Sequence, residues 1–156
     1  MPSVSSCLWF DHQALEAAEF YVSVFPNSRI KGVSHYGEAG PGAAGSVLTV
    51  GFELDGTEFL ALNGGPLFTF SEAVSFVVRC SGQAEIDHYW DRLVEGGEES
   101  QCGWLKDRFG LSWQVVPKMF ELLMSDADQG RRDRAMAAVL QMRKLDLQAI
   151  LAAADG

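Results

Sequence analysis

The spacing of apolar and polar residues at the start of the chain predicts a strand followed by a helix. Residues 4–10, VSSCLWF, alternate in character and are rich in residues that favour β-structure. After the polar residues DHQ, apolar positions recur every three or four residues, which places them on one helix face. These positions are Ala14, Ala17, Ala18, Tyr21, Val22 and Phe25. The segment FPNS at 25–28 ends this predicted helix.

Three further strands complete the first half of the chain. They are predicted at 29–36 (RIKGVSHY), 46–54 (SVLTVGFEL) and 57–63 (TEFLALN). The dipeptide Asp55-Gly56 separates the last two, and Asp-Gly is a strong signal for a two-residue hairpin turn. The predicted order over residues 4–63 is therefore βαβββ.

The same pattern restarts in the second half. VSFVVRC at 74–80 predicts a strand, and QAEIDHYWDRLVEGG at 83–97 predicts an amphipathic helix. An offset of 70 residues brings the two halves into register. FGLSWQVV at 109–116 then repeats the turn-and-strand pattern of DGTEFLAL at 55–62. We therefore expect a second βαβββ module over residues 72–117.

The remaining residues, 118–156, predict a helical tail. Apolar residues continue there at helical spacing, at Met136, Val139, Leu140, Leu147, Ile150 and Leu151. We expect such an apolar helix face to be buried, either against the body of the protein or against a partner chain. The expected fold class is α+β, with two tandem modules and C-terminal helices. Because 156 residues with 47% hydrophobic content can fill one core, we expect residues 1–156 to form a single domain.

Charge narrows the range of partners. The net charge of -9 opposes binding to nucleic acid or to anionic membrane surfaces. The tail is less acidic than the rest, since residues 130–156 carry five Lys and Arg against three Asp. These basic residues are expected to pair with the acidic body or a second subunit, or to lie solvated on a helix face. The N-terminus predicts no leader or membrane span, and the three cysteines predict reduced thiols, which together indicate a cytoplasmic protein.

Two segments carry a resemblance to a known family: LWFDHQALEAAEFYVSVFPNS at 8–28 and CGWLKDRFGLSWQVVP at 102–117. Together with the two βαβββ patterns, they resemble the PhnB-like branch of the vicinal oxygen chelate superfamily. Sequences of that branch often carry the label 3-demethylubiquinone-9 3-methyltransferase. The resemblance implies a mixed sheet curled around a cleft. It also implies metal ligands on the first and last strands of each module, where enzymes of the superfamily place His, Glu or Gln.

This sequence departs from that ligand pattern. The four positions fall on Ser6, on Leu60 or Leu62, on Ser75 or Val77, and on Gln114. Gln114 is the one plausible donor among them, and one carboxamide does not hold a divalent cation against water. The three histidines are not placed at ligand spacing. We therefore expect no metal and no other cofactor.

Strand alternation suggests which side chains line the cleft. If the ligand positions face it, the candidates for ligand binding are Ser6, Glu53, Ser75, Arg79, Trp104 and Gln114. The opposite sides, with Cys7 and Trp9 in the first strand, are then expected beneath the helices.

Several of these candidates have a structural alternative. Arg79 can bind a carboxylate or phosphonate, or pair with an acid at the strand end. Gln114 can contact a ligand, or satisfy a strand edge or a buried water. Glu53 can face the cleft or solvent, and Trp104 can contact a ligand or only pack. Within KDRFG, residues 106–110, Gly110 is expected to make the turn and the three charged residues to face solvent.

The function expected from this pattern is a homodimeric protein that binds a small organic ligand in a metal-free cleft. One alternative is a metal-dependent lyase or dioxygenase of the same superfamily. A second is the methyltransferase of the label, which is disfavoured because no glycine-rich nucleotide turn follows a strand. A third alternative is that residues 102–117 only stabilise the fold and bind no ligand.

Overall fold

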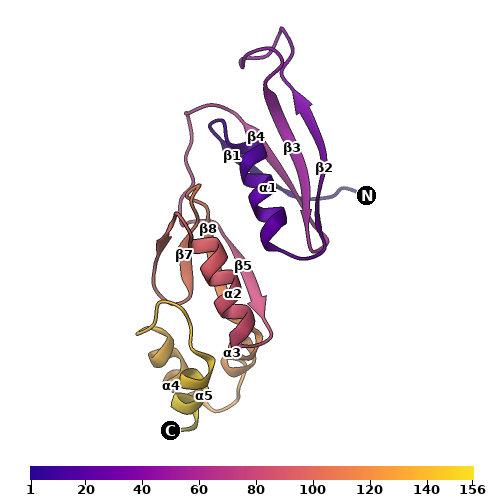
Figure 1. Cartoon of the computed structure of the whole chain (residues 1–156). Helices are drawn as coiled ribbons and strands as arrows, with labels where there is room; N and C mark the ends of the chain where they lie inside the picture. Colours follow the sequence, from indigo (N-terminus) through magenta and orange to yellow (C-terminus); the bar gives the residue numbers. More distant parts are fainter. The chain divides into compact units, whose positions relative to one another are not determined.

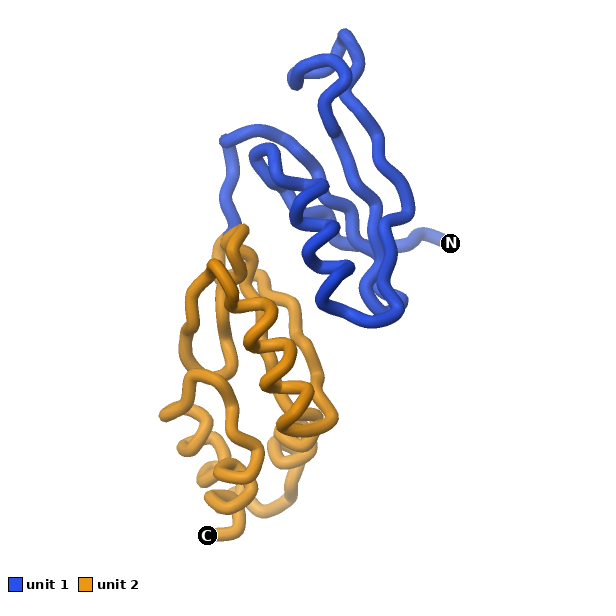
Figure 2. Tube along the Cα trace, in the orientation of Figure 1, with its two compact units in different colours: residues 1–70 blue, residues 71–156 orange.

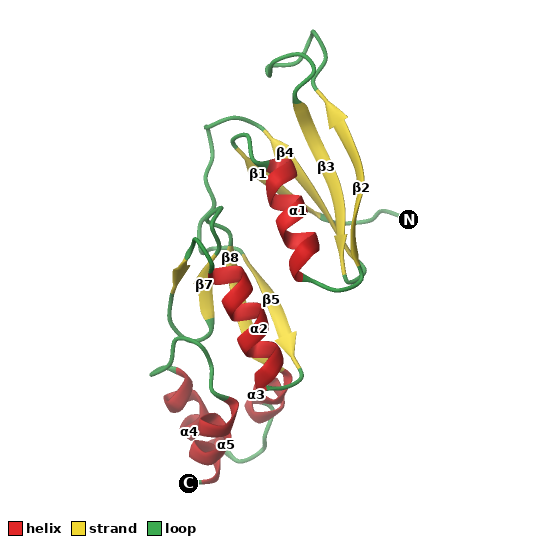
Figure 3. Ribbon diagram, viewed as in Figure 1, coloured by secondary structure: helices red, strands yellow, loops and turns green.

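A computed structural model describes all residues, 1–156, and contains two four-stranded sheets with five helices (Figures 1 and 3). Contacts within the chain group it into two compact units, residues 1–70 and 71–156 (Figure 2). Each unit contains one βαβββ module, which confirms the predicted α+β fold with two modules. The prediction that both modules belong to a single domain stays a prediction.

The first module has the predicted elements and a mixed sheet. Its elements are β1 (Ser6–Phe10), α1 (Ala14–Val24), β2 (Ser28–His35), β3 (Val47–Leu54) and β4 (Thr57–Asn63). The strand order is β1-β4-β3-β2, in which β1 runs parallel to β4 and the other neighbours are antiparallel. Asp55 and Gly56 both have positive φ, at 45° and 86°, as a two-residue hairpin turn of the predicted kind requires.

The second module repeats this connectivity and is followed by the tail. Its elements are β5 (Ser75–Cys80), α2 (Gln83–Val94), β6 (Glu98–Glu99), β7 (Trp104–Lys106) and β8 (Ser112–Pro117). The strand order is β5-β8-β7-β6, with β5 parallel to β8. The tail forms α3 (Lys118–Met124), α4 (Gln129–Val139) and α5 (Leu147–Asp155). None of the helices is long and apolar enough to cross a membrane.

In each module one helix covers one face of the sheet (Figure 1), and we call the opposite face the open face. In the first module, Phe52 of β3 stacks on Tyr21 of α1, with ring centroids 6.1 Å apart. In the second module, Trp113 and Val115 of β8 are buried on the side that α2 covers, as predicted. The open face of the second module is the side of its sheet opposite α2.

The predicted faces of β1 are wrong. Leu8 and Phe10 are buried, and strand pairing places Leu8 beside Ala61 on the helix-covered face. Cys7 is exposed and pairs with Leu60 on the opposite face. The reason is the connection to the helix, which has three residues in the first module (11–13) and two in the second (81–82). Side chains alternate between the two faces along a strand. A connection that is one residue longer therefore puts the residue at a given number of positions before the helix on the opposite face of the sheet.

The prediction that Asp107 faces solvent is also wrong. Its side chain is 2% exposed and accepts hydrogen bonds at Oδ1 from the backbone N–H groups of Phe109, at 2.8 Å, and Leu111, at 3.1 Å. Its Oδ2 accepts a third from Trp113 Nε1 at 2.9 Å. Gly110 has φ of 86° and makes the turn, as predicted. Asp107 thus organises the β7–β8 turn from inside, while Arg108 is exposed.

The tail packs on the second module as an integral part of that unit. Its buried apolar residues form one cluster with Val116 of β8: Leu123, Ala135, Val139, Leu145, Ile150 and Ala154. The side chain of Gln83 donates to the Leu145 carbonyl at 3.0 Å and accepts from the Leu147 N–H at 2.8 Å. The predicted apolar face of the tail is therefore covered within the chain in part: Val139 and Ile150 are buried, whereas Met136 and Leu140 are exposed.

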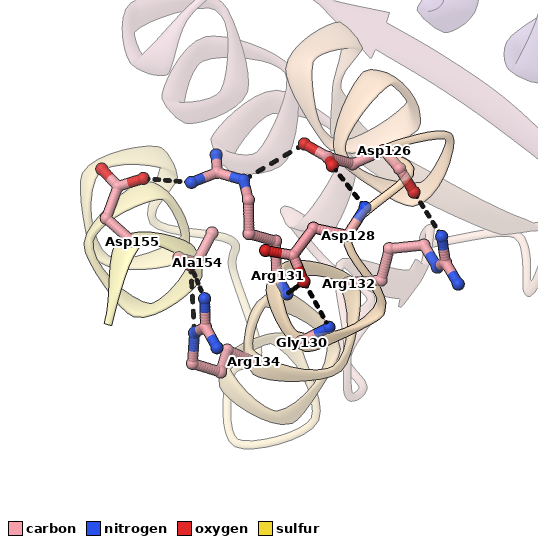
Figure 4. Close-up of polar contacts among 8 residues, drawn as sticks. All are labelled: Asp126, Asp128, Gly130, Arg131, Arg132, Arg134, Ala154 and Asp155. Carbon is pink, nitrogen blue, oxygen red and sulfur yellow. Dashed lines mark hydrogen bonds and ion pairs between the residues drawn. The ribbon is translucent and has the colours of Figure 1, made fainter.

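The basic residues of the tail divide between two roles. Lys144 pairs with Asp87 at 2.9 Å and Arg143 with Glu99 at 3.6 Å, which confirms pairing with the acidic body. Two arginines of α4, Arg131 and Arg134, instead bind the end of α5 (Figure 4). Arg134 donates to the Ala154 carbonyl from two nitrogens, at 3.0 and 2.7 Å. Arg131 bridges Asp126 and Asp155 in the same view.

We predict that Asp107→Ala lowers the free energy of unfolding by about 3 kcal/mol, because three buried donors lose a charged acceptor. Asp107→Asn should lose less, since its amide oxygen still accepts from the backbone. Urea titrations followed by circular dichroism measure both changes. Asp133→Ala, at an exposed position of α4, is the matched control. A loss for Asp107→Ala no larger than that of the control would contradict the role assigned to this carboxylate.

Candidate functional site

Strand register arranges the open face of the second module in three rows. The first row across β5, β8, β7 and β6 consists of Ser75, Ser112, Lys106 and Glu98. The second row, across β5, β8 and β7, consists of Val77, Gln114 and Trp104. The third row is Arg79 beside Val116. Four of the six predicted site residues therefore share this face: Ser75, Arg79, Trp104 and Gln114.

In the second row, the carboxamide of Gln114 and the indole of Trp104 are neighbours. Gln114 lies directly opposite Trp104 in the β7–β8 pair, and its Nε2 donates to Ser75 Oγ at 3.0 Å. This contact uses one side of the carboxamide. Trp104 is half-buried. The second row thus offers an aromatic ring next to an amide group, a combination suited to orienting a small organic molecule.

Ser112 in the first row has a polar atom without a partner. The residue is 1% exposed, and its Oγ makes no hydrogen bond in the structure. Buried hydroxyls almost always have a partner, so Ser112 is an exception within this fold. The structure places this hydroxyl beside Lys106, its pairing partner on β7.

A cavity of about 220 Å³ lies at this end of the open face. It is lined by Glu72, Glu98, Glu99, Ser100, Trp104, Leu105, Lys106 and Ser112. Lys106 Nζ pairs with Glu72 and lies 4.0 Å from Glu98 Oε1. The hydrogen bond and charge of Glu72 raise the pKa of Lys106, and Lys106 in turn lowers the pKa of Glu72. Both groups are therefore charged at neutral pH.

The third row is partly closed by the tail. Arg79 Nε donates to Glu121 Oε1 of α3 at 2.7 Å, so the structure has the alternative in which Arg79 pairs with an acid at the strand end. Val116 is buried in the cluster formed with the tail. The tail thus covers Val116, whereas Arg79 pairs with Glu121 and stays exposed.

The other two predicted site residues lie in the first module, on opposite faces of its sheet. Ser6 pairs with Phe59 on the helix-covered face, so its predicted position on the cleft side is wrong. The reason is the reversed parity of β1. Glu53 lies on the open face of that sheet and pairs with Arg29 at 3.3 Å.

The positions implied for metal ligands do not fit a metal ion. The open faces present Leu60 and Leu62 in the first module and Val77 beside Gln114 in the second. Divalent metals need several nitrogen, sulfur or oxygen ligands converging on one point. No group of three or more His, Cys, Asp and Glu side chains in the structure could hold a metal ion.

Of the residues that line the cavity, sequence reasoning proposed Trp104 as a site residue and missed the others. Alternation along β8 does place Ser112 on the same side as Gln114, but it does not single that serine out as a site residue. Lys106 was expected to face solvent, but it pairs with Glu72, which lies in the segment before β5. No local pattern indicates a contact between residues this far apart.

Comparison with known proteins identifies the family. The family model described as 3-demethylubiquinone-9 3-methyltransferase matches residues 2–116. The chain belongs to this family. No curated protein matches the sequence. The family model ends one residue before the end of β8, so the helical tail, 118–156, lies beyond it.

Solved structures agree with the family assignment. The PhnB protein from Bacillus cereus, whose description also carries the family label, is 34% identical, with a TM-score of 0.68 over 74% of this chain and 99% of that chain. Protein PA1353 from Pseudomonas aeruginosa is 18% identical, with a TM-score of 0.62 over 75% and 98%. The fosfomycin resistance protein FosX from Listeria monocytogenes, solved with Mn(II) and sulfate, is 14% identical, with a TM-score of 0.54 over 80% and 96%. These similarities confirm the vicinal oxygen chelate fold.

Proposed function

We propose that the open face of the second module binds a small organic ligand without a metal ion. The observation that carries this proposal is the cavity of about 220 Å³ on that face, whose lining includes Trp104, Lys106 and Ser112. Gln114 and Trp104 in the adjacent row supply an amide and an aromatic surface. Polar groups that can orient a ligand, next to an aromatic side chain, are typical of small-molecule sites.

Gln114→Ala is expected to weaken ligand binding with little loss of stability, because the side chain is half-buried and its one partner is Ser75. A thermal-shift screen of small organic molecules on the wild type should find compounds that raise Tm, since a ligand that binds only the folded state stabilises it. The same compounds should raise the Tm of Gln114→Ala less. Gln148→Ala, on the exposed side of α5, is the matched control and should respond like wild type.

Two results of this screen would count against the proposal. Equal stabilisation of wild type and Gln114→Ala would place the binding elsewhere on the protein. If no compound stabilises any form, residues 102–117 serve the fold alone, as Asp107 and Trp113 already do through their hydrogen bond.

A metal-dependent lyase or dioxygenase is the competing function within the superfamily. FosX, a fold neighbour at 14% identity, was solved with Mn(II). Our proposal predicts that purified protein, dialysed after exposure to Mn, Fe, Ni or Zn salts, retains less than one equivalent of each metal by elemental analysis. Stoichiometric retention of one of them, with loss of that metal on Gln114→Ala, would favour the enzyme.

The methyl transfer named by the family label is not part of our proposal. Binding of S-adenosylmethionine typically uses a glycine-rich turn between a strand and a helix of a doubly wound sheet. The two strand-to-helix turns of this chain are Asp11-His12-Gln13 and Ser81-Gly82. Each module has one helix on one face of a mixed sheet instead.

We also propose that the protein is a homodimer in solution. Exposed apolar side chains support this, among them Leu122 and Leu140 of the tail region, which are 66% and 56% exposed. Light scattering on the full chain should give twice the monomer mass of 17.0 kDa. A mass equal to that of the monomer across the concentration range would refute the dimer.

A further inference from the structure

The third row of the open face carries hydrogen-bond donors that the fold leaves unused. Arg79 bonds through Nε alone, to Glu121 Oε1 at 2.7 Å, and its two terminal nitrogens have no partner. A guanidinium group has five N–H donors and no acceptor, so a group that binds those nitrogens must accept hydrogen bonds. A carboxylate accepts two parallel bonds from a guanidinium group, and the opposite charges strengthen both. Arg79 therefore favours the acid group of a ligand over a neutral or a cationic group.

Glu121 meets Arg79 because the first helix of the tail begins where the last strand ends. Val116 lies beside Arg79 in the β5–β8 pair, and α3 starts at Lys118, directly after β8. Leu123 of α3 is buried in the tail cluster, which holds this helix against the second module. The Glu121 side chain itself is 50% exposed. It can therefore leave Arg79 by rotation about its own bonds, while the helix stays in place.

The adjacent row supplies an apolar surface and further polar groups. Val77 precedes Arg79 by two residues on β5, so the two lie on the same face, about 6.6 Å apart along the strand. Val77 is 36% exposed, and next to it in the row come Gln114 and then Trp104. Gln114 bonds only through Nε2, and the Trp104 indole makes no hydrogen bond, so one acceptor and one donor are unused. A ligand whose acid group binds Arg79 can place its apolar body on Val77, beside these two groups.

The charges around Arg79 already accommodate one carboxylate. The glutamates of the cavity lie at the other end of the open face, since the first and third rows are four residues apart along β8, or about 13 Å. That separation exceeds the screening length of about 8 Å at physiological salt. Just beyond β5, Lys118 and Glu85 both bond to Ser81, at 3.4 and 2.7 Å. A ligand carboxylate that takes the place of Glu121 therefore keeps the local balance of charge.

We propose that the open face of the second module binds an organic acid, whose carboxylate takes the place of Glu121 on Arg79. Glu121 is then an internal competitor that the tail supplies. This inference rests on the proposed function, because it names the ligand class for the same open face. Exposed ion pairs contribute little to stability, so competition from Glu121 should weaken binding by only about two- to fivefold.

The test compares three probes that share a benzene ring and differ in charge: benzoate, benzamide and benzylammonium. Binding to the full chain is followed by nitrogen-15 NMR on the side-chain amide signal of Gln114, which is assigned from Gln114→Ala. We expect benzoate to shift this signal in a saturable manner. Benzamide and benzylammonium should leave it in place, because neither offers a carboxylate to Arg79.

Variants of the ion pair test the competition directly. Arg79→Gln should weaken benzoate binding about tenfold, the effect of losing a charge-assisted hydrogen bond. Glu121→Gln should strengthen it about two- to fivefold, because the competing carboxylate is gone. Glu95→Gln is the matched control, since it removes the same charge from an exposed position at the end of α2. This control should bind benzoate like the wild type.

The outcomes distinguish this inference from the proposed function. A gain in Glu121→Gln no larger than that of Glu95→Gln, or an unchanged affinity in Arg79→Gln, would overturn the inference. Saturable shifts with benzamide or benzylammonium as tight as those with benzoate would overturn the ligand class while leaving a ligand site on the open face. No shift with any probe would also overturn the inference, whereas the proposed function is decided by the broader thermal-shift screen.

Discussion

The β7–β8 hairpin keeps its register through one buried carboxylate, and the candidate site depends on that register. Asp107 accepts from two backbone N–H groups of the turn and from the Trp113 indole. These bonds set which residue of β7 lies opposite which residue of β8. Because a slip of one residue would exchange the two faces of the strand, the pairs Trp104–Gln114 and Lys106–Ser112 require this turn. A side chain that the sequence alone suggests is at the surface therefore positions the residues of the candidate site.

The tail gives the second module a different open face from the first. In the second module, Val116 is buried under tail residues and Arg79 is bound by Glu121. The first module has no such extension, and Leu60 at the position equivalent to Gln114 is 37% exposed. Since the family model ends at residue 116, this closure comes from a segment outside the matched region. The tail thereby buries Val116 and supplies the carboxylate that pairs with Arg79.

The two modules also differ in how strand and helix are joined. Asp11-His12-Gln13 connects β1 to α1, and Asn63 Oδ1 of β4 accepts from the Ala14 N–H at 2.8 Å, where the helix begins. In the second module the connection is Ser81-Gly82, and the first helical residue, Gln83, bonds to the tail instead. The start of the helix therefore forms different hydrogen bonds in the two modules. In the first module it bonds to the sheet of the same module, and in the second module it bonds to the tail.

The sequence by itself determined the order and type of the elements, because apolar periodicity and turn residues act over a few neighbouring positions. It also placed Ser75, Arg79 and Gln114 on one face, since alternation along a strand is local. Only the tertiary structure decided the side of β1, because parity there depends on how many residues connect the strand to the helix. It alone decided the burial of Asp107, the pairing of Lys106 with Glu72 and the closure of Arg79 by Glu121. Those contacts join residues from different elements, and their free energy depends on desolvation in the folded chain, which no local pattern encodes.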